Sequence, residues 1–261
     1  MIVGLIGAGH IAQALAEGWS RSGLTAAPRL RFYDVDSEKA ASLAARCGGE
    51  AAASLAGLVA PCDLIVVAVR PQHVDGVLLS LAPLIEERVV VSVAAGVTMD
   101  RLLGSLPARS RVARVMPNIP AALGLGVFLL VPGTVGPARQ DVESLFALAG
   151  EVVALEEELF DAATAVAGCM AGMLARFVEA FTAAAEAHGV PADTAARLAM
   201  GGVHGAAALI AREGDAAAVS AAAATPGGMT EAAITALDAR GLAAAVAAAV
   251  DAATARAKDL A

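Results

Sequence analysis

The chain opens with a glycine-rich turn whose residue types and spacing suit the binding of phosphate. Gly7, Gly9 and Ala12 form the pattern G-x-G-x-x-A directly after a short apolar run. The first glycine permits a tight strand-to-helix turn, the second lets a ligand approach the backbone, and the alanine lets the helix pack close to the sheet. The amides at the N-terminus of that helix then face the anion. The pattern predicts a dinucleotide pyrophosphate site at Gly7, Gly9, His10, Ile11 and Ala12, with a phosphate-free α/β turn as the alternative.

An acidic residue, Asp34, ends the next apolar run, 30–33. In a dinucleotide site, a carboxylate at the end of the second strand accepts hydrogen bonds from the ribose 2′-hydroxyl and repels a 2′-phosphate. The nearest cation that follows is Lys39. Asp34 therefore predicts a nicotinamide cofactor, NAD(P)H, with a preference for NADH over NADPH. The alternative is that Asp34 caps the helix that follows.

Apolar runs alternate with helical patterns through the first half of the chain, and these elements must position the glycine turn and Asp34. The run 63–69 is continuous and largely β-branched, which is typical of a strand covered on both faces. The predicted strands are 2–6, 30–33, 63–69, 88–93, 112–116, 126–131 and 151–155. A helix is predicted after the glycine turn, and others at 38–47, 74–84, 99–106 and 140–148. The alternation predicts an α/β fold, with a Rossmann-type doubly wound sheet in residues 1–156.

The second half of the chain, residues 157–261, shows helical patterns and no convincing strand. The predicted helices are 159–188, 192–212, 216–223 and 229–258, and turns rich in glycine and proline separate three of them. Alanine dominates this half; it favours helix and buries little area per residue. We therefore expect an all-helical C-terminal domain of closely packed helices.

Composition restricts the classes of partner. The 261 residues carry a formal net charge of −8, and no basic stripe indicates nucleic acid. Cys47, Cys62 and Cys169 form no metal or redox pair, so we expect free thiols in a reducing cytoplasm and no metal. The N-terminus lacks the features of a signal peptide, and prolines interrupt the long uncharged run 115–138. These observations predict a cytoplasmic protein that does not enter the membrane.

Three further segments follow predicted strands, and hence lie at the carboxyl edge of the sheet where ligands bind. Arg70 and Pro71 form a stiff turn directly after Ala68 and Val69, which end the predicted strand 63–69, and a plain strand-ending turn is the alternative. The small residues Ala94, Ala95 and Gly96 would let a flat nicotinamide approach. Asn118 stands between Pro117 and Pro120, and its amide suits either a carboxamide or a loop clamp, with an ordinary Asx-turn as the alternative. We assign the following residues to the cofactor site: Ala68, Val69, Arg70, Pro71, Ala94, Ala95, Gly96 and Asn118.

A fourth segment, Pro226-Gly227-Gly228-Met229-Thr230, opens a predicted helix. Consecutive backbone amides at a helix N-terminus favour an anion. The alternative is a simple helix cap, with Thr230 as the capping residue.

In their order and spacing, these segments resemble the pyrroline-5-carboxylate reductase family over essentially the whole chain. The segments MPN-x-P and PGG-x-T are the specific part of the resemblance, whereas the glycine turn is generic. The resemblance implies a helical domain that forms homodimers, sometimes assembled further, and NAD(P)H-dependent reduction of 1-pyrroline-5-carboxylate to proline. It also implies that Thr230 contacts the imine nitrogen as the catalytic residue, and that the loop grips the substrate carboxylate. The implied substrate-binding residues are Gly227, Gly228, Met229, Thr230, Cys169 and Met173.

The chain departs from the family pattern at the substrate side. Where the family carries S-G-S-G-P-A-Y, this chain has 167–173 with Cys169 and Met173, and Ile119 and Met229 replace two further threonines. These changes remove polar groups, which favours a bulkier or less polar imine. Drift in a loop that acts through its backbone is the alternative.

Several rival interpretations remain. His204 is a second candidate for the general acid, although a surface or packed position on a helix explains it better. A hydroxyacid dehydrogenase-like reductase would need a catalytic lysine in the second domain, and no lysine lies between Lys39 and Lys258. A cofactor-binding sensor without catalysis is the remaining alternative.

Overall fold

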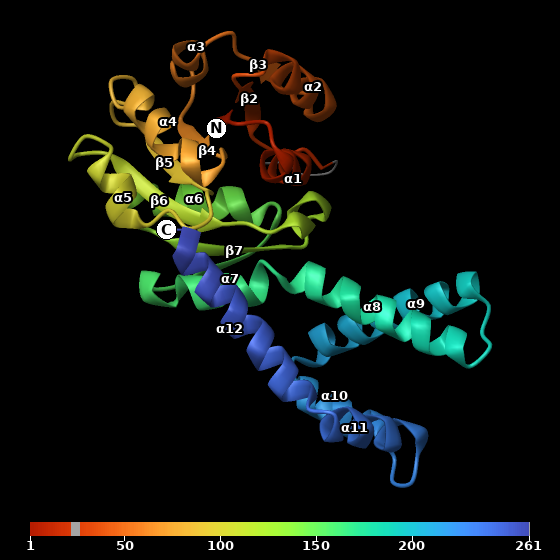
Figure 1. The fold of residues 1–261 in the computed structure, drawn as a ribbon. Helices are drawn as coiled ribbons and strands as arrows, with labels where there is room; N and C mark the ends of the chain where they lie inside the picture. Colours follow the sequence, from red (N-terminus) through yellow and green to blue (C-terminus); the bar gives the residue numbers. More distant parts are fainter. Residues whose placement is uncertain (22–26, 261) are drawn as a thin grey trace. The chain divides into compact units, whose positions relative to one another are not determined.

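The computed structural model describes residues 1–21 and 27–260. Within them lies one eight-stranded sheet with the order β3-β2-β1-β4-β5-β6-β7-β8 (Figure 1). Only the pairing of β6 with β7 is antiparallel. The strands are β1 (Ile2–Ile6), β2 (Arg29–Tyr33), β3 (Glu50–Ala51), β4 (Leu64–Val67), β5 (Val89–Ser92), β6 (Arg111–Met116), β7 (Gly126–Val131) and β8 (Gly150–Ala154). The predicted α/β fold with a doubly wound sheet is confirmed.

Helices cover both faces of this sheet. One face packs against α1 (His10–Trp19), α2 (Ser37–Cys47) and α6 (Arg139–Ala147). The other packs against α3 (Leu55–Val59), α4 (Val74–Leu81), α5 (Met99–Gly104) and α7 (Phe160–Ala167). Short 3₁₀ turns link them: η1 (Pro71–His73), η2 (Ile119–Leu123), η3 (Gly136–Ala138) and η4 (Glu157–Leu159). Because β4 and β5 are buried along their whole length, their carboxyl ends hold the loops that follow them in fixed positions.

A second compact unit holds four of the remaining helices and the first part of the fifth, α12, whose residues from Ala253 belong to the first unit. They are α8 (Met170–Ala187), α9 (Ala192–Glu213), α10 (Ala216–Ala223), α11 (Met229–Ala239) and α12 (Leu242–Leu260). By backbone packing, the first unit comprises residues 1–168 together with the C-terminal residues from Ala253, and the second comprises Cys169–Ala252. The division at 156/157 stays a prediction; in the structure, α7 packs with the sheet through the buried Phe160.

The structure corrects several predicted elements. The predicted strand 63–69 is shorter and ends at Val67. The predicted helix 159–188 is interrupted at Gly168–Cys169, and the predicted helix 229–258 breaks at Arg240–Gly241, where Gly241 has φ 77°. Strand β3 and helix α3 were not predicted, because two residues of strand and five of helix are too short to show a period.

The second unit exposes a large apolar surface. Met170, Leu174, Phe177 and Phe181 recur on α8 at helical spacing, and all four are exposed. By length and composition, the stretch 157–187 is apolar enough to cross a membrane, as is the bent pair α11 and α12 taken together. A helix face that packs against a second subunit has the same composition, so this property alone does not distinguish the two.

Candidate active site

A groove of about 1520 Å³ runs along the carboxyl edge of the sheet. It is lined by the glycine turn, by the loops after β2, β4 and β5, and by Met116 and Pro117 at the end of β6. The predicted cofactor residues that line it are Gly7, Gly9, His10, Ile11, Asp34, Ala68, Val69, Arg70, Pro71, Ala94 and Ala95. The structure thus brings together predicted residues from four separate segments of the sequence.

Ala12, Gly96 and Asn118, which were also assigned to the cofactor, do not line this groove. Ala12 is fully buried between α1 and the sheet, in agreement with a packing role. Conversely, Gln13, Gly76 and Ser80 line the groove and were not predicted. Gln13 directly follows the glycine motif but is not part of its pattern, and no motif surrounds Gly76 or Ser80.

The two glycines of the turn are glycine for different reasons. Gly7 has φ 97°, and a Cβ there would lie 2.6 Å from the carbonyl oxygen of Ala68, so the fold itself requires glycine. Gly9 has φ −79°, and a Cβ there would meet no atom within 4 Å. Nothing within the protein excludes a side chain at Gly9. The open space in front of it is the space that a pyrophosphate would occupy.

The first turn of α1 is likewise left open for an anion. Its N-cap residue, Gly9, provides no side-chain cap, and no acidic residue stands in the first turn. The amides at this end therefore lack the side-chain acceptor that a helix N-terminus usually has. The residues present fit a dinucleotide phosphate.

Asp34 connects the glycine turn to the loop after β2. One carboxylate oxygen accepts a hydrogen bond from the amide of Ala8 at 2.7 Å, and the other accepts one from the amide of Asp36 at 2.9 Å. The helix cap is a different residue: Asp36 is the N-cap of α2 and accepts from the amides of Glu38 and Lys39. The alternative that Asp34 caps this helix is therefore wrong.

The cation nearest to Asp34 in the following sequence is already paired. The Lys39 ammonium lies 3.1 Å from the carboxylate of Asp36 and, with the Lys39 amide, lowers the pKa of Asp36. Asp34, Asp36 and Glu38 all line the groove at this end. Three carboxylates close to a ribose would repel a 2′-phosphate.

Asn118 uses both polar atoms of its amide within the fold. Its Nδ2 donates to the carbonyl of Ala167 at 3.0 Å, and its Oδ1 accepts from the amide of Val127 at 2.9 Å. The side chain is buried. The assignment of Asn118 to the cofactor is not supported by this geometry, because the amide acts as a loop clamp.

The loop 226–230 leads into α11 in the second unit, and its last two residues, Met229 and Thr230, begin that helix. Gly228 is the N-cap of that helix, so Thr230 is not the capping residue. The amide of Gly227 donates to the carboxylate of Glu231 at 2.7 Å, and the amide of Gly228 donates to the carbonyl of Thr225 at 2.8 Å. Both glycine amides are therefore occupied by the protein, and Glu231 would have to move before Gly227 could bind an anion.

The other residues predicted for the substrate also lie in the second unit. Met229 is 91% exposed, Cys169 is exposed just before α8, and Met173 is half-buried in the first turn of that helix. The roles of Gly227, Gly228, Met229, Thr230, Cys169 and Met173 in substrate binding stay predictions.

Other reactive groups do not compete with this site. Burial raises the pKa of the Cys62 thiol to about 11, which makes it a poor nucleophile. His204 is exposed on α9. Within residues 1–21 and 27–260, no three potential ligands are placed to hold a metal ion.

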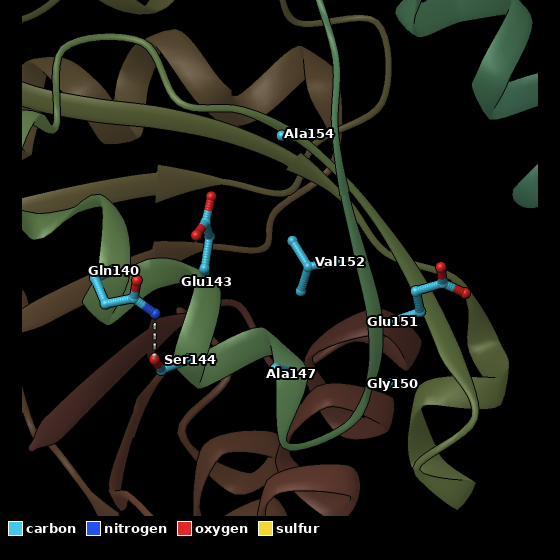
Figure 2. A pocket seen from close by; sticks show the side chains of 8 residues that line it. All are labelled: Gln140, Glu143, Ser144, Ala147, Gly150, Glu151, Val152 and Ala154. Atoms are coloured by element: carbon cyan, nitrogen blue, oxygen red, sulfur yellow. Dashed lines mark hydrogen bonds between the residues drawn. The ribbon is translucent and has the colours of Figure 1, made fainter.

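A second hollow, of about 430 Å³, lies between α6 and β8. Figure 2 shows that Gln140 bonds to Ser144 there, and that Val152 lies between the side chains of Glu143 and Glu151 in this view. Glu143 is also paired with Arg139. The two carboxylates do not converge, so this hollow lacks the arrangement of an acid–base pair.

The fold and the groove define a two-domain oxidoreductase with a nicotinamide cofactor. The family described as NADP oxidoreductase coenzyme F420-dependent matches residues 2–96, and the family described as pyrroline-5-carboxylate reductase dimerisation matches residues 157–260. The chain belongs to the pyrroline-5-carboxylate reductase family, as the comparisons with single proteins also show.

Three of these comparisons cover almost the whole chain. The pyrroline-5-carboxylate reductase of Pseudomonas aeruginosa is 34% identical over 99% of this chain and 96% of its own length. The crystal structure of a pyrroline-5-carboxylate reductase from Coxiella burnetii superposes with a TM-score of 0.90 at 27% identity, covering 99% of this chain and 97% of that one. The NADP-bound pyrroline carboxylate reductase of Plasmodium falciparum shares the fold, with a TM-score of 0.87 at 23% identity and coverage of 100% and 98%.

Proposed function

We propose that the protein reduces 1-pyrroline-5-carboxylate to L-proline with a nicotinamide cofactor. The observation that carries the proposal is the open space at Gly9, in a chain that belongs to the pyrroline-5-carboxylate reductase family. The loop 226–230 supports it, because the segment PGG-x-T is present in the register that the family uses.

The chemistry needs a cofactor and a correctly oriented imine. A nicotinamide bound in the groove would supply the hydride that adds to the imine carbon. The small side chains of Ala94 and Ala95 leave room for a flat ring at the edge of the sheet. Thr230 would orient the imine nitrogen by a hydrogen bond, since a hydroxyl is too weak an acid to protonate it fully. The proton arrives with the substrate or from water, and positioning is the main contribution of the protein.

NADH is the preferred cofactor in this proposal. Asp34 and two further carboxylates line the groove where the ribose of the cofactor would lie, and Lys39 is paired with Asp36. The enzyme acts in the cytoplasm as a homodimer formed through its helical domain. The match to the dimerisation family and the exposed apolar residues of α8 support the dimer.

A less polar or bulkier imine is the second candidate substrate. Met229 and Cys169 favour it, because both are exposed where the family carries hydroxyl groups. A comparison of 1-pyrroline-5-carboxylate with six-membered and bulkier imines decides between the two substrates. A strong preference for 1-pyrroline-5-carboxylate would exclude the less polar or bulkier imine as the substrate.

Substitution of Thr230 tests the proposed role of the loop. Thr230→Val keeps the shape and removes the hydroxyl, so kcat/KM for the imine should fall by about tenfold or more, the loss of a hydrogen bond of at least about 1.4 kcal/mol. Thr235→Val, on the exposed side of the same helix, is the matched control and should leave kcat/KM unchanged. Equal activities of both variants would remove Thr230 from the site.

A further inference from the structure

Asn118 lies just after β6, the strand whose end borders the groove. Strand β6 ends at Met116, and Met116 and Pro117 both line the groove. Asn118 follows directly and turns its amide away from the groove, into the protein. Its two hydrogen bonds join β7, at Val127, to the last residue of α7, Ala167. One buried side chain thus links the border of the groove to the end of a helix 49 residues later in sequence.

The start of α7 is fastened to β6. Arg114 on β6 is 3% exposed and donates to the carboxylate of Glu157 at 2.8 Å. The same carboxylate accepts the amide of Met99, and the Arg114 guanidinium lies 3.9 Å from the centre of the Phe160 ring. Helix α7 is therefore held at its start by Arg114 and at its end by Asn118.

The chain leaves the first compact unit directly after this clamp. Gly168 is the last residue of its main segment, and Cys169 begins the second unit. Cys169 and Met173 are the residues that the family resemblance places beside the substrate. The point from which this segment starts is set by the carbonyl that Asn118 holds.

We propose that Asn118 is a positioning residue, whose buried amide fixes the end of α7 and thereby the start of the substrate segment, without contacting the cofactor. The part that concerns the reaction rests on the proposed function. The amide needs both a donor and an acceptor, because Ala167 offers an oxygen and Val127 offers an N–H. Loss of the donor should release α7 and leave the groove intact.

Asn118→Ala and Asn118→Asp separate the two halves of the clamp. Asn118→Asp keeps the acceptor for Val127 but points an oxygen at the carbonyl of Ala167. In its ionised form that oxygen repels the carbonyl, whereas in its protonated form it donates a hydrogen bond. The neighbouring elements add few charges, since β7 and η2 carry none, and α7 carries only Asp161, which lies 3.9 Å from Arg114.

The experiment measures kcat, cofactor affinity and hydrogen exchange on the same proteins. We expect kcat for the imine to fall by about tenfold to a hundredfold in both variants at neutral pH, while the Kd of NADH stays within twofold of the wild type. As the pH is lowered, Asn118→Asp should regain activity relative to the wild type, and Asn118→Ala should not. Gln140→Glu, the same amide-to-acid change on an exposed residue of α6, is the control and should behave as the wild type.

Hydrogen exchange makes the outcome independent of turnover. In Asn118→Ala, amides in 164–170 should exchange faster than in the wild type, whereas those of the glycine turn should not. A tenfold loss of NADH affinity with unchanged exchange in 164–170 would overturn the proposal, as would unchanged kcat with faster exchange. If the wild type reduces no imine, the proposed function fails, and exchange and NADH affinity still decide whether Asn118 is a clamp or a ligand.

Discussion

The fold does not require glycine at position 9, although this position opens the helix at the groove. A side chain there would meet no atom of the protein, and its backbone dihedral is one that any residue adopts. Gly7, two residues earlier, has a positive φ and lies against Ala68, just after the end of β4. A ligand explains glycine at position 9, whereas the architecture of the turn explains it at position 7.

This difference predicts opposite behaviour for two alanine variants. Gly9→Ala should lose no more than about 1 kcal/mol of stability, since alanine is a poorer N-cap than glycine, and should bind NADH at least tenfold more weakly, a loss of about 1.4 kcal/mol. Gly7→Ala should be destabilised by about 1–3 kcal/mol, because its backbone would be strained. Thermal unfolding and cofactor titration check both.

Gly104→Ala, at the end of α5 with open space around it, is the control: it should leave the affinity for NADH unchanged and raise stability by no more than about 1 kcal/mol, because alanine favours helix over glycine. Unchanged NADH affinity in Gly9→Ala would show that the space is not used by the cofactor.

At the scale of elements, the sequence was most informative where strands are long and buried. Strands β1 and β7 have the predicted bounds, because their apolar runs end at glycine or proline. The break between α7 and α8 was not predicted, since glycine and cysteine interrupt no apolar period there. The two partners of Asn118 could not be predicted from the sequence either. They are backbone atoms of Val127 and Ala167, and a backbone atom leaves no signal in the residue types.

The buried pair of Arg114 and Glu157 predicts a large effect on stability. Arg114→Met removes the guanidinium and leaves Glu157 and Asp161 without their cation. Breaking a buried pair costs roughly 3–5 kcal/mol, and we expect the lower end of that range because Glu157 is 30% exposed at its side chain. Urea unfolding at neutral pH measures the difference.

Arg139→Met removes a surface pair on α6 and serves as the comparison. It should cost about 0.3–0.5 kcal/mol. If Arg114→Met costs no more than this, the buried pair does not hold α7 to the sheet.

For the whole molecule, the main feature of the second unit is an exposed apolar stripe on α8. The residues of the α8 stripe, Met170, Leu174, Phe177 and Phe181, are exposed at 38–50%, and the two phenylalanine rings lie 5.9 Å apart. The dimerisation family matches this region. A sequence predicts such a stripe through its period, but it does not predict which surface covers the stripe.

The stripe predicts that Phe181 contributes to a subunit interface. If the proposed homodimer forms through this stripe, Phe181→Asp should shift the protein from dimer to monomer, because each buried phenylalanine contributes about 1.5–3 kcal/mol. Light scattering across a range of concentrations measures the mass. Ala183→Asp, exposed on a different side of the same helix, should remain a dimer, and a dimeric Phe181→Asp would place the interface elsewhere.

The substrate side of the site was the least predictable part. The loop 226–230 matches the family in sequence, yet in the structure Glu231 and Thr225 occupy its two glycine amides. The segment PGG-x-T specifies the backbone conformation of the loop. Which group accepts hydrogen bonds from the amides of Gly227 and Gly228 depends on the acceptors nearby, here Glu231 and Thr225. Only a reaction with substrate shows whether the loop accepts a carboxylate.

The most direct test of the account is the conversion of 1-pyrroline-5-carboxylate by the purified wild-type protein. Oxidation of the cofactor is followed by absorbance, proline is quantified in the same samples, and NADH is compared with NADPH. The account predicts one proline formed for each reduced cofactor consumed, with a higher kcat/KM for NADH. Tight binding of NADH without proline formation would contradict it and would favour a cofactor-binding protein that does not catalyse this reaction.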